Sequence, residues 1–189
     1  DTVAINLREI APTFVLGVPR IWEKMQAGFI FRLRDSGRIR HGLFQWCLKR
    51  GRALSDRRVA TKGKTGAADW LLGKLLYWMM FRNVQRYMGL NRSRWRLCGG
   101  ASISPETLRF FDIIGLPVGQ GYGLTESSGL AFAQENVSYF RTGSSGSAYR
   151  QTEWKLASDG ELLLRSPGVF QGYLFNEQAT AETFTEEGW

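Results

Sequence analysis

The sequence predicts an α/β protein with a mostly parallel sheet, flanking helices and a small β-rich segment toward its C-terminal end. Residues 95–118 have the order strand, glycine turn, helix, strand, which is the βαβ pattern of a parallel sheet covered by helices. A short apolar run bounded by prolines, residues 11–18, suits another buried strand. Farther on, residues 154–156 and 161–165 flank a Ser-Asp-Gly turn, which predicts a hairpin.

The region between the first strand and the βαβ unit is predicted to be helical. Pro19 can occupy the first turn of a helix that residues 20–31 continue. Residues 32–68 indicate a helix followed by a mobile loop around TKGKTGA. Residues 69–90 indicate another helix, with Asp69 as its N-cap and a glycine near its end. Charged and amide side chains interrupt this last helix, so we predict a buried or membrane-surface helix rather than a spanning one.

The βαβ unit places two glycine turns, residues 99–101 and 119–123, at strand ends. Ser104 is the predicted N-cap of the intervening helix, which runs to residue 114, and Gly115 ends it. In open parallel sheets, ligands bind outside the carboxyl ends of the strands. Both glycine turns are therefore candidate ligand-binding loops.

Domain organisation follows from these elements. We expect residues 1–150 to form an α/β subdomain with a basic helical insert at about 28–92, and residues 151–189 to start a β-rich subdomain. The sequence has no initiator methionine and no closing element at Trp189, so we expect a piece of a longer protein. Its two cysteines make no disulfide framework, which predicts a reduced, cytoplasmic setting.

Positive charge is concentrated in one block. The formal net charge is +8, and residues 28–96 hold 17 Lys and Arg against three Asp, whereas residues 97–189 hold more acidic than basic groups. Such a block can bind nucleic acid, anionic lipid or a polyphosphate, or it can be a solvated helical face. The arginines follow no nucleic-acid recognition motif and His41 is the only histidine, so no nucleic-acid partner is expected.

The stretch QGYGLTESSG, residues 120–129, carries groups that a magnesium nucleotide would use together. Its glycines let the backbone pass close to a flat or charged ligand. Tyr122 offers a ring face to a purine or to the core, and Thr125 offers a hydroxyl to a phosphate oxygen. Glu126 is an oxygen ligand of the kind that Mg²⁺ prefers. The alternative is a structural turn in which a threonine or serine caps the next helix.

QGYGLTE resembles the adenine- and phosphate-contacting motif of the AMP-forming adenylating enzymes, the superfamily of acyl-CoA synthetases, luciferases and peptide-synthetase adenylation domains. Three further segments resemble that superfamily in its own order: PTFVLGVPRIWEKM at 12–25, LCGGASISPETLRFF at 97–111, and GELLLRSPGVFQGYLFNEQATAETFTEEGW at 160–189. The first is similar to a segment of the long-chain fatty acyl-CoA synthetase branch. The basic, tryptophan-rich stretch after it fits an extra helical region of that branch. The resemblance covers nearly the whole chain, which would be part of the large N-terminal domain.

The resemblance implies a nucleotide site built from two segments. The loop that lines the adenine and the acyl carboxylate matches Gly99, Gly100 and Ala101. The adenine-binding motif matches Gln120, Gly121, Tyr122, Gly123 and Leu124, with the tyrosine stacked on the base. Thr125 matches the contact to the α-phosphate and Glu126 matches the magnesium ligand, which makes these two residues the catalytic candidates.

The implied protein is an ATP-dependent long-chain fatty acid–CoA ligase that forms acyl-CoA through an acyl-adenylate. Its substrates and cofactors would be a fatty acid, ATP (leaving as AMP), Mg²⁺ and coenzyme A, and its basic region 28–96 is expected to contact anionic membranes peripherally. The family's upstream phosphate loop and its C-terminal domain are absent from these residues, so the isolated segment is predicted not to catalyse. Two alternatives are open: a relative that loads acyl-adenylates onto a carrier protein, and a non-catalytic nucleotide- or membrane-binding protein.

Overall fold

The computed structural model describes residues 2–35, 37–134 and 141–189. Contacts divide the chain into two compact units: Asp1–Gly119 with Asn136–Ser144, and Gln120–Glu135 with Ser145–Trp189. The predicted subdomain boundary at residue 150 stays a prediction.

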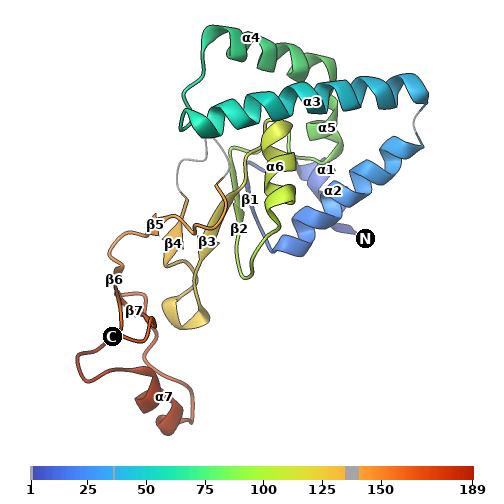
Figure 1. The fold of residues 1–189 in the computed structure, drawn as a ribbon. Helices are drawn as coiled ribbons and strands as arrows, with labels where there is room; N and C mark the ends of the chain where they lie inside the picture. Colours follow the sequence, from blue (N-terminus) through green and yellow to red (C-terminus); the bar gives the residue numbers. More distant parts are fainter. Residues whose placement is uncertain (1, 36, 135–140) are drawn as a thin grey trace. The chain divides into compact units, whose positions relative to one another are not determined.

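The first unit is mainly helical around two parallel strands (Figure 1). Its elements are α1 (Thr2–Ile10), β1 (Phe14–Gly17), α2 (Pro19–Arg34), α3 (Arg38–Ala60), α4 (Ala67–Leu76), a π-helical segment (Tyr77–Phe81), α5 (Arg82–Tyr87), β2 (Trp95–Cys98) and α6 (Pro105–Ile113). Strands β1 and β2 pair in parallel, with Phe14 opposite Trp95 and Gly17 opposite Cys98. Both predicted strands and the predicted α6 are confirmed.

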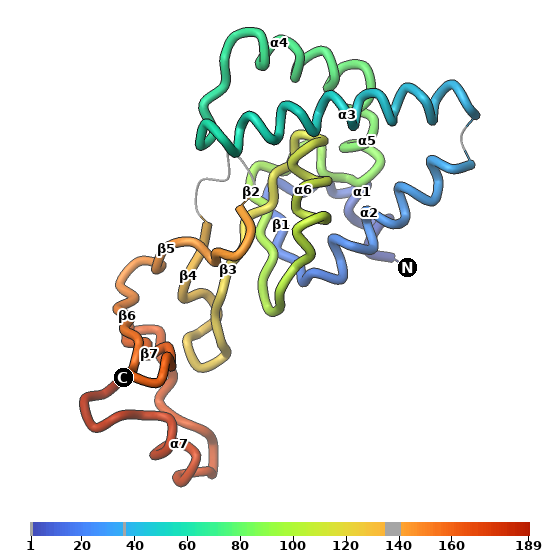
Figure 2. The backbone as a smooth tube through the Cα atoms, in the orientation of Figure 1, coloured from blue at the N-terminus to red at the C-terminus, as the bar shows by residue number. Residues whose placement is uncertain are grey.

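The core of this unit lies where α6 meets α2 and α3. Trp22 and Phe111 are fully buried, and their rings meet edge to face at 5.1 Å. Phe44 of α3 is also buried and lies against Phe29 of α2, with ring centroids 5.1 Å apart. Helix α3 packs on α6 with one side and on α4 with another, so α4 is the outer layer (Figures 1 and 2). Apolar packing of this kind is the main source of stability in a helical layer.

Two helices of the first unit end as their glycines predict. Gly115, with φ of +80°, donates its N–H to the carbonyl of Asp112 at 3.0 Å, and the Leu116 N–H donates to Phe111 at 2.8 Å. The same pair of bonds follows α5, where Gly89 has φ of +72°. These are Schellman motifs, which satisfy carbonyls that a helix end leaves free. At the start of α6, the Ser104 hydroxyl accepts the Glu106 N–H at 3.2 Å, so the predicted N-cap is confirmed.

Two details of the predicted helix at 69–90 are wrong. The helix begins earlier, at Ala67, so Asp69 lies in its first turn and pairs with Arg57 at 2.9 Å instead of capping. The helix is also interrupted by the π segment. Leu76 and Phe81, five residues apart, are both buried, a spacing that fits the wider π turn rather than an α-helix.

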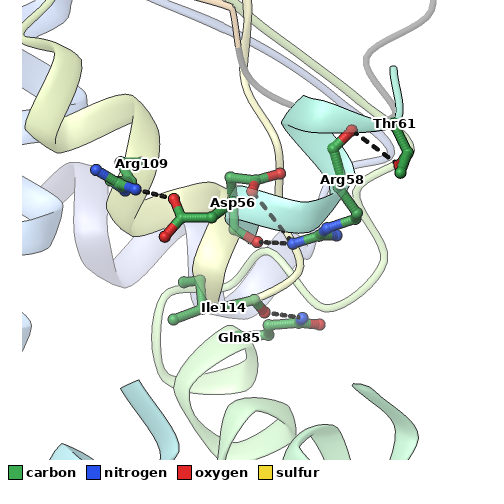
Figure 3. Close-up of polar contacts among 7 residues, drawn as sticks. Asp56, Arg58, Thr61, Gln85, Arg109 and Ile114 are labelled. Atoms are coloured by element: carbon green, nitrogen blue, oxygen red, sulfur yellow. Dashed lines mark hydrogen bonds and ion pairs between the residues drawn. The ribbon is translucent and has the colours of Figure 1, made fainter. Parts of the chain in front are cut away.

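Polar contacts fasten α3 and α5 to the end of α6 (Figure 3). Arg58 donates from Nη2 to the carbonyl of Asp112 at 2.9 Å and to its carboxylate at 3.2 Å, and the Asp112 side chain is fully buried. One turn away, the exposed Asp56 pairs with Arg109. Gln85 of α5 donates its side-chain amide to the Ile114 carbonyl at 2.8 Å.

The second unit is made of short strands. Its elements are β3 (Gly119–Tyr122), a 3₁₀ turn (Thr125–Ser127), β4 (Phe132–Ala133), β5 (Ser147–Ala148), β6 (Glu153–Leu156), β7 (Leu162–Arg165) and α7 (Glu177–Thr183). Strands β3, β4 and β5 pair antiparallel, and β6 and β7 form the predicted hairpin, whose turn has Gly160 at φ of +91°. The α/β class with flanking helices is confirmed, and strand pairing is both parallel and antiparallel. Over the described ranges, none of the helices has the length and apolar character needed to cross a membrane.

Candidate functional site

The loop at residues 99–101 lies where the paired strands of the first unit end together. The Gly99 N–H donates to the Gly17 carbonyl at 3.3 Å, so the ends of β1 and β2 are held side by side. Gly100 has φ of +83°, a left-handed conformation that favours glycine. Gly100 and Ala101 are exposed. The loop therefore presents nearly bare backbone at the carboxyl ends of two parallel strands.

Cys98, just before this loop, is a packing residue. It is buried, and burial, assisted by the negative charge of Glu23, raises the pKa of its thiol to about 11. The thiol is therefore protonated at neutral pH, and a protonated thiol is a poor nucleophile.

The stretch 120–129 forms one strand and the turn of a β-hairpin rather than only the predicted glycine turn. β3 runs through Tyr122, so most of the expected glycine turn at 119–123 is strand, paired antiparallel with β4. The Ala131 N–H donates to the Tyr122 carbonyl, and the Gly129 N–H to the Leu124 carbonyl, each at 2.9 Å. A Cβ at Gly123 would lie 1.4 Å from the Gly129 carbonyl oxygen. The backbone at Gly129 thus lies too close to position 123 for any side chain, and this alone requires glycine there without a bound ligand.

Tyr122 keeps part of its ring open. It lies against Phe132 with centroids 6.1 Å apart, and 37% of the residue remains exposed. Gln120 and Gly121 are within the β3–β4 pairing, where the Gln120 N–H donates to the Gln134 side chain at 3.3 Å. Leu124 is exposed beyond the strand. The strand thus presents one aromatic surface at the mouth of the hairpin.

Ser127 holds the 3₁₀ turn, and this leaves Thr125 available. The Ser127 hydroxyl accepts the Leu124 N–H and donates to the Leu124 carbonyl, both at 3.0 Å. Thr125 is exposed, and its hydroxyl makes no hydrogen bond to any residue in the described part of the chain. The structural turn and the ligand-binding interpretation are therefore compatible, because different hydroxyls would serve them.

Glu126 is held by a tyrosine that the sequence did not reveal. The Tyr173 hydroxyl donates to Glu126 Oε1 at 2.7 Å, and the Phe170 N–H donates to the Glu126 carbonyl at 2.8 Å. The bond from Tyr173 lowers the pKa of the Glu126 carboxyl, and the same bond raises the pKa of Tyr173. A hydrogen bond from the backbone N–H of Glu126 itself also lowers the pKa of this carboxyl. The side chain is thus a carboxylate at neutral pH, which is the kind of oxygen ligand that a hard cation binds.

Tyr173 is itself fixed in place. Its N–H donates to Thr180 Oγ1 at 2.9 Å, and its ring meets Phe170 edge to face at 4.8 Å. The Ser128 hydroxyl donates to the Gly168 carbonyl at 2.6 Å, which fastens the same segment to the hairpin. Tyr173 lies 47 residues from Glu126, and no spacing rule links the two positions. The one sequence signal for Tyr173 was that it belongs to the 160–189 segment, which resembles the adenylating enzymes.

The donor set fits magnesium better than a metal held by protein alone. The described residues include no group of three or more His, Cys, Asp or Glu side chains that could hold a metal ion. Mg²⁺ commonly takes one or two carboxylates and completes its shell with water and substrate phosphates. A single carboxylate beside a free hydroxyl meets that requirement at Glu126 and Thr125. The hairpin brings Tyr122, Thr125 and Glu126 together, whereas residues 99–101 belong to the first unit.

An α/β fold that carries an aromatic surface, a free hydroxyl and a carboxylate on one hairpin is a candidate nucleotide-binding protein. The model of the AMP-binding enzyme family matches residues 2–174, and the chain belongs to this family. A protein of Mycobacterium tuberculosis, provisionally named a fatty-acid–CoA ligase, is 34% identical over the whole chain. A long-chain-fatty-acid–CoA ligase of Rattus norvegicus is 31% identical, again over the whole chain. The chain spans 33% and 28% of the lengths of these curated relatives.

Solved structures share the fold. The chain aligns over 98% of its length with a malonyl-CoA ligase bound to methylmalonyl-CoA and AMP, at a TM-score of 0.57 and 21% identity, covering 31% of that protein. It aligns over its full length with the adenylation domain of a carboxylate reductase from Mycobacterium chelonae, at a TM-score of 0.57 and 22% identity, covering 25% of that chain. The predicted family and fold are therefore confirmed, and the predicted site residues stay predictions.

Proposed function

We propose that this chain is the central part of an ATP-dependent long-chain fatty acid–CoA ligase, which makes acyl-CoA through an acyl-adenylate. Family membership and relatives named as fatty-acid–CoA ligases, at 29–34% identity, support this proposal. The observation that carries it is the Thr125–Glu126 pair, because a carboxylate beside a free hydroxyl is what a magnesium nucleotide needs.

Each candidate residue has a role in the proposal. Tyr122 stacks on the adenine, and the Thr125 hydroxyl donates to an α-phosphate oxygen. The backbone of residues 99–101 lines the adenine and the acyl carboxylate. Glu126 would hold Mg²⁺, which when bound neutralises phosphate charge as two anions approach. Tyr173 keeps Glu126 ionised and oriented, so it is a positioning residue.

The test uses the complete reading frame. ATP- and coenzyme A-dependent formation of palmitoyl-CoA is measured for the parent protein and for Glu126→Gln. We expect the variant to lose activity on the order of 100-fold, the usual effect of removing one preorganised electrostatic group. Glu182→Gln is the matched control, because Glu182 is an exposed carboxylate on α7 whose hydrogen bond within the described residues is to Gln178. This control should keep the parent rate.

Other outcomes separate the alternatives. Pyrophosphate release without thioester formation would identify a relative that loads a carrier protein. If both glutamate variants lose the same activity, or if Glu126→Gln keeps the parent activity, Glu126 is not part of the active site. No turnover of any fatty acid by the complete protein would overturn the proposal. The isolated 189 residues are predicted to be inactive.

A further inference from the structure

The outward side of α4 and the π segment carries large apolar side chains in the open. This surface, here called the α4 outer face, consists of Trp70, Leu71, Lys74, Leu75, Trp78, Met79 and Arg82. Trp70, Leu71 and Trp78 are each 60–65% exposed. A contiguous exposed apolar face on a helix marks an interaction surface.

The opposite side of the same helix packs into the core of the first unit. Leu76 and Phe81 are buried, and a Cβ on Gly73 would lie 4.0 Å from Leu54 of α3. Helix α3 separates α4 from α6 (Figure 2). The α4 outer face therefore points away from the core, and in the described part of the chain no element covers it.

Cations alternate with the tryptophans along this face. The Lys74 ammonium lies 5.6 Å from the centroid of the Trp70 ring, and the Arg82 guanidinium lies 4.8 Å from that of Trp78. Both cations follow their tryptophan by four residues, so each pair occupies one side of the helix. Long basic side chains can rest on apolar surface while their charged ends stay in water.

The positive charge around this face is not balanced locally. Residues 28–96 contain only three acidic groups, and two of them are already paired: Asp56 with Arg109, and Asp69 with Arg57. The helical region that carries this face therefore has a net positive charge, which attracts an anionic surface.

We infer that the α4 outer face docks on an anionic lipid surface. The tryptophan rings and aliphatic side chains would enter the boundary between headgroups and acyl chains, while Lys74 and Arg82 would meet lipid phosphates. A nucleic-acid ligand is disfavoured, because this face has five apolar side chains and only two cations. The inference does not depend on the ligase proposal, since its test measures binding and not turnover.

The experiment measures co-sedimentation of the complete protein with vesicles of phosphatidylcholine, with and without phosphatidylglycerol, across a salt series. We expect clear binding to the anionic vesicles, weak binding to the neutral ones, and a decline with salt. Lys74→Gln with Arg82→Gln should weaken binding about 30-fold at low salt, from about fivefold per cation. Trp70→Ser with Trp78→Ser should weaken it at every salt concentration. Phe175→Ser is the control, because Phe175 is 97% exposed on the second unit.

Several results would overturn the inference. One is parent protein that binds neither vesicle. Another is an unchanged affinity in both double variants, and a third is preference for an oligonucleotide over anionic vesicles. If the rest of the complete chain covers the face, the tryptophan variant will lower the melting temperature while vesicle binding stays absent, and that result also rejects it.

Discussion

The two units of this protein are stabilised in different ways. The first buries large side chains such as Trp22, Phe44 and Phe111 between helices. In the second, the buried residues among those described are Ala131, Ala133 and Gln134. Its candidate site depends on backbone hydrogen bonds, a glycine close approach and the bond from Tyr173 to Glu126. The comparison shows that the packing of large apolar side chains stabilises the first unit, whereas directional hydrogen bonds fix the candidate site in the second.

The largest expected effect tests the buried ion pair of the first unit. Asp112→Ala would leave the Arg58 guanidinium without its carboxylate at a buried position, so we expect a loss of about 3–5 kcal/mol in the free energy of unfolding. The neighbouring Asp56→Ala removes an exposed pair and should cost about 1 kcal/mol or less. Urea unfolding of the complete protein measures both. If the two variants lose the same free energy of unfolding, burial does not make the Arg58–Asp112 pair more important than the Arg109–Asp56 pair.

A single methyl group should disrupt the hairpin of the second unit. In Gly123→Ala, the new Cβ meets the Gly129 carbonyl, and we expect roughly 2 kcal/mol of local destabilisation. Hydrogen exchange at the Gly129 and Ala131 amides should accelerate, while the Leu116 amide of the first unit keeps its protection. Gly42→Ala is the control, because its Cβ would meet nothing within 4 Å. Slow exchange at both hairpin amides in Gly123→Ala would contradict the close approach.

Removing one hydroxyl tests the site without moving the fold. Tyr173→Phe keeps the ring against Phe170 but removes the bond to Glu126, so we expect ligase activity to fall about tenfold, as for other residues that orient a metal ligand. Without that bond, the pKa of Glu126 should rise toward its ordinary value. The acid limb of the pH–rate profile should therefore move to higher pH.

The same bond has a defined pH dependence in stability. The pKa of Glu126 is lower in the folded protein than its ordinary value. The ionised carboxylate therefore contributes fully to the free energy of unfolding above the ordinary carboxyl pKa, and this contribution is lost as pH falls through the lowered pKa. The stability difference between parent and Tyr173→Phe should thus vanish in acid. A difference that persists below the depressed pKa would mean that the phenol acts through packing alone.

The smallest effect concerns a helix cap. Ser104→Ala removes the acceptor of the Glu106 N–H, and we expect about 1 kcal/mol of lost stability by urea unfolding, with unchanged exchange in the hairpin. Restoration by Ser104→Asp would identify the cap as the cause. Comparable loss in both variants would point to another role for the side chain.

Local rules predicted much of the first unit. The Ser104 cap and the helix-ending glycines depend on neighbours within one turn, and they stand where the sequence places them. Asp69 failed as a cap because the helix begins two residues earlier, at Ala67, and the Asp69 carboxylate pairs with Arg57 of another helix. The π segment was missed because residue propensities do not distinguish it from an α-helix, although both Leu76 and Phe81 at its ends are buried in the core.

The candidate site was predicted less completely. Thr125 and Glu126 were found because they are adjacent in the chain and belong to a motif with clear chemistry. The conformation around them was not, since the pairing of β3 with β4 converts an expected turn into strand. Tyr173 could not be found because its hydrogen bond joins it to Glu126, a residue 47 positions away in the sequence.

The π segment also sets a constraint on how the sequence can change. An α-helix turns by about 100° per residue, so the extra residue in the wide turn fixes the angle between the tryptophan side of α4 and the core side of α5. Deleting one residue between Tyr77 and Phe81 would rotate one side against the other by about that angle. Either the buried Val84 would then turn out of the core, or the exposed Trp78 would turn toward it. Folding should tolerate substitutions at the outer positions of this helix, whereas the length of the helix is not free to vary.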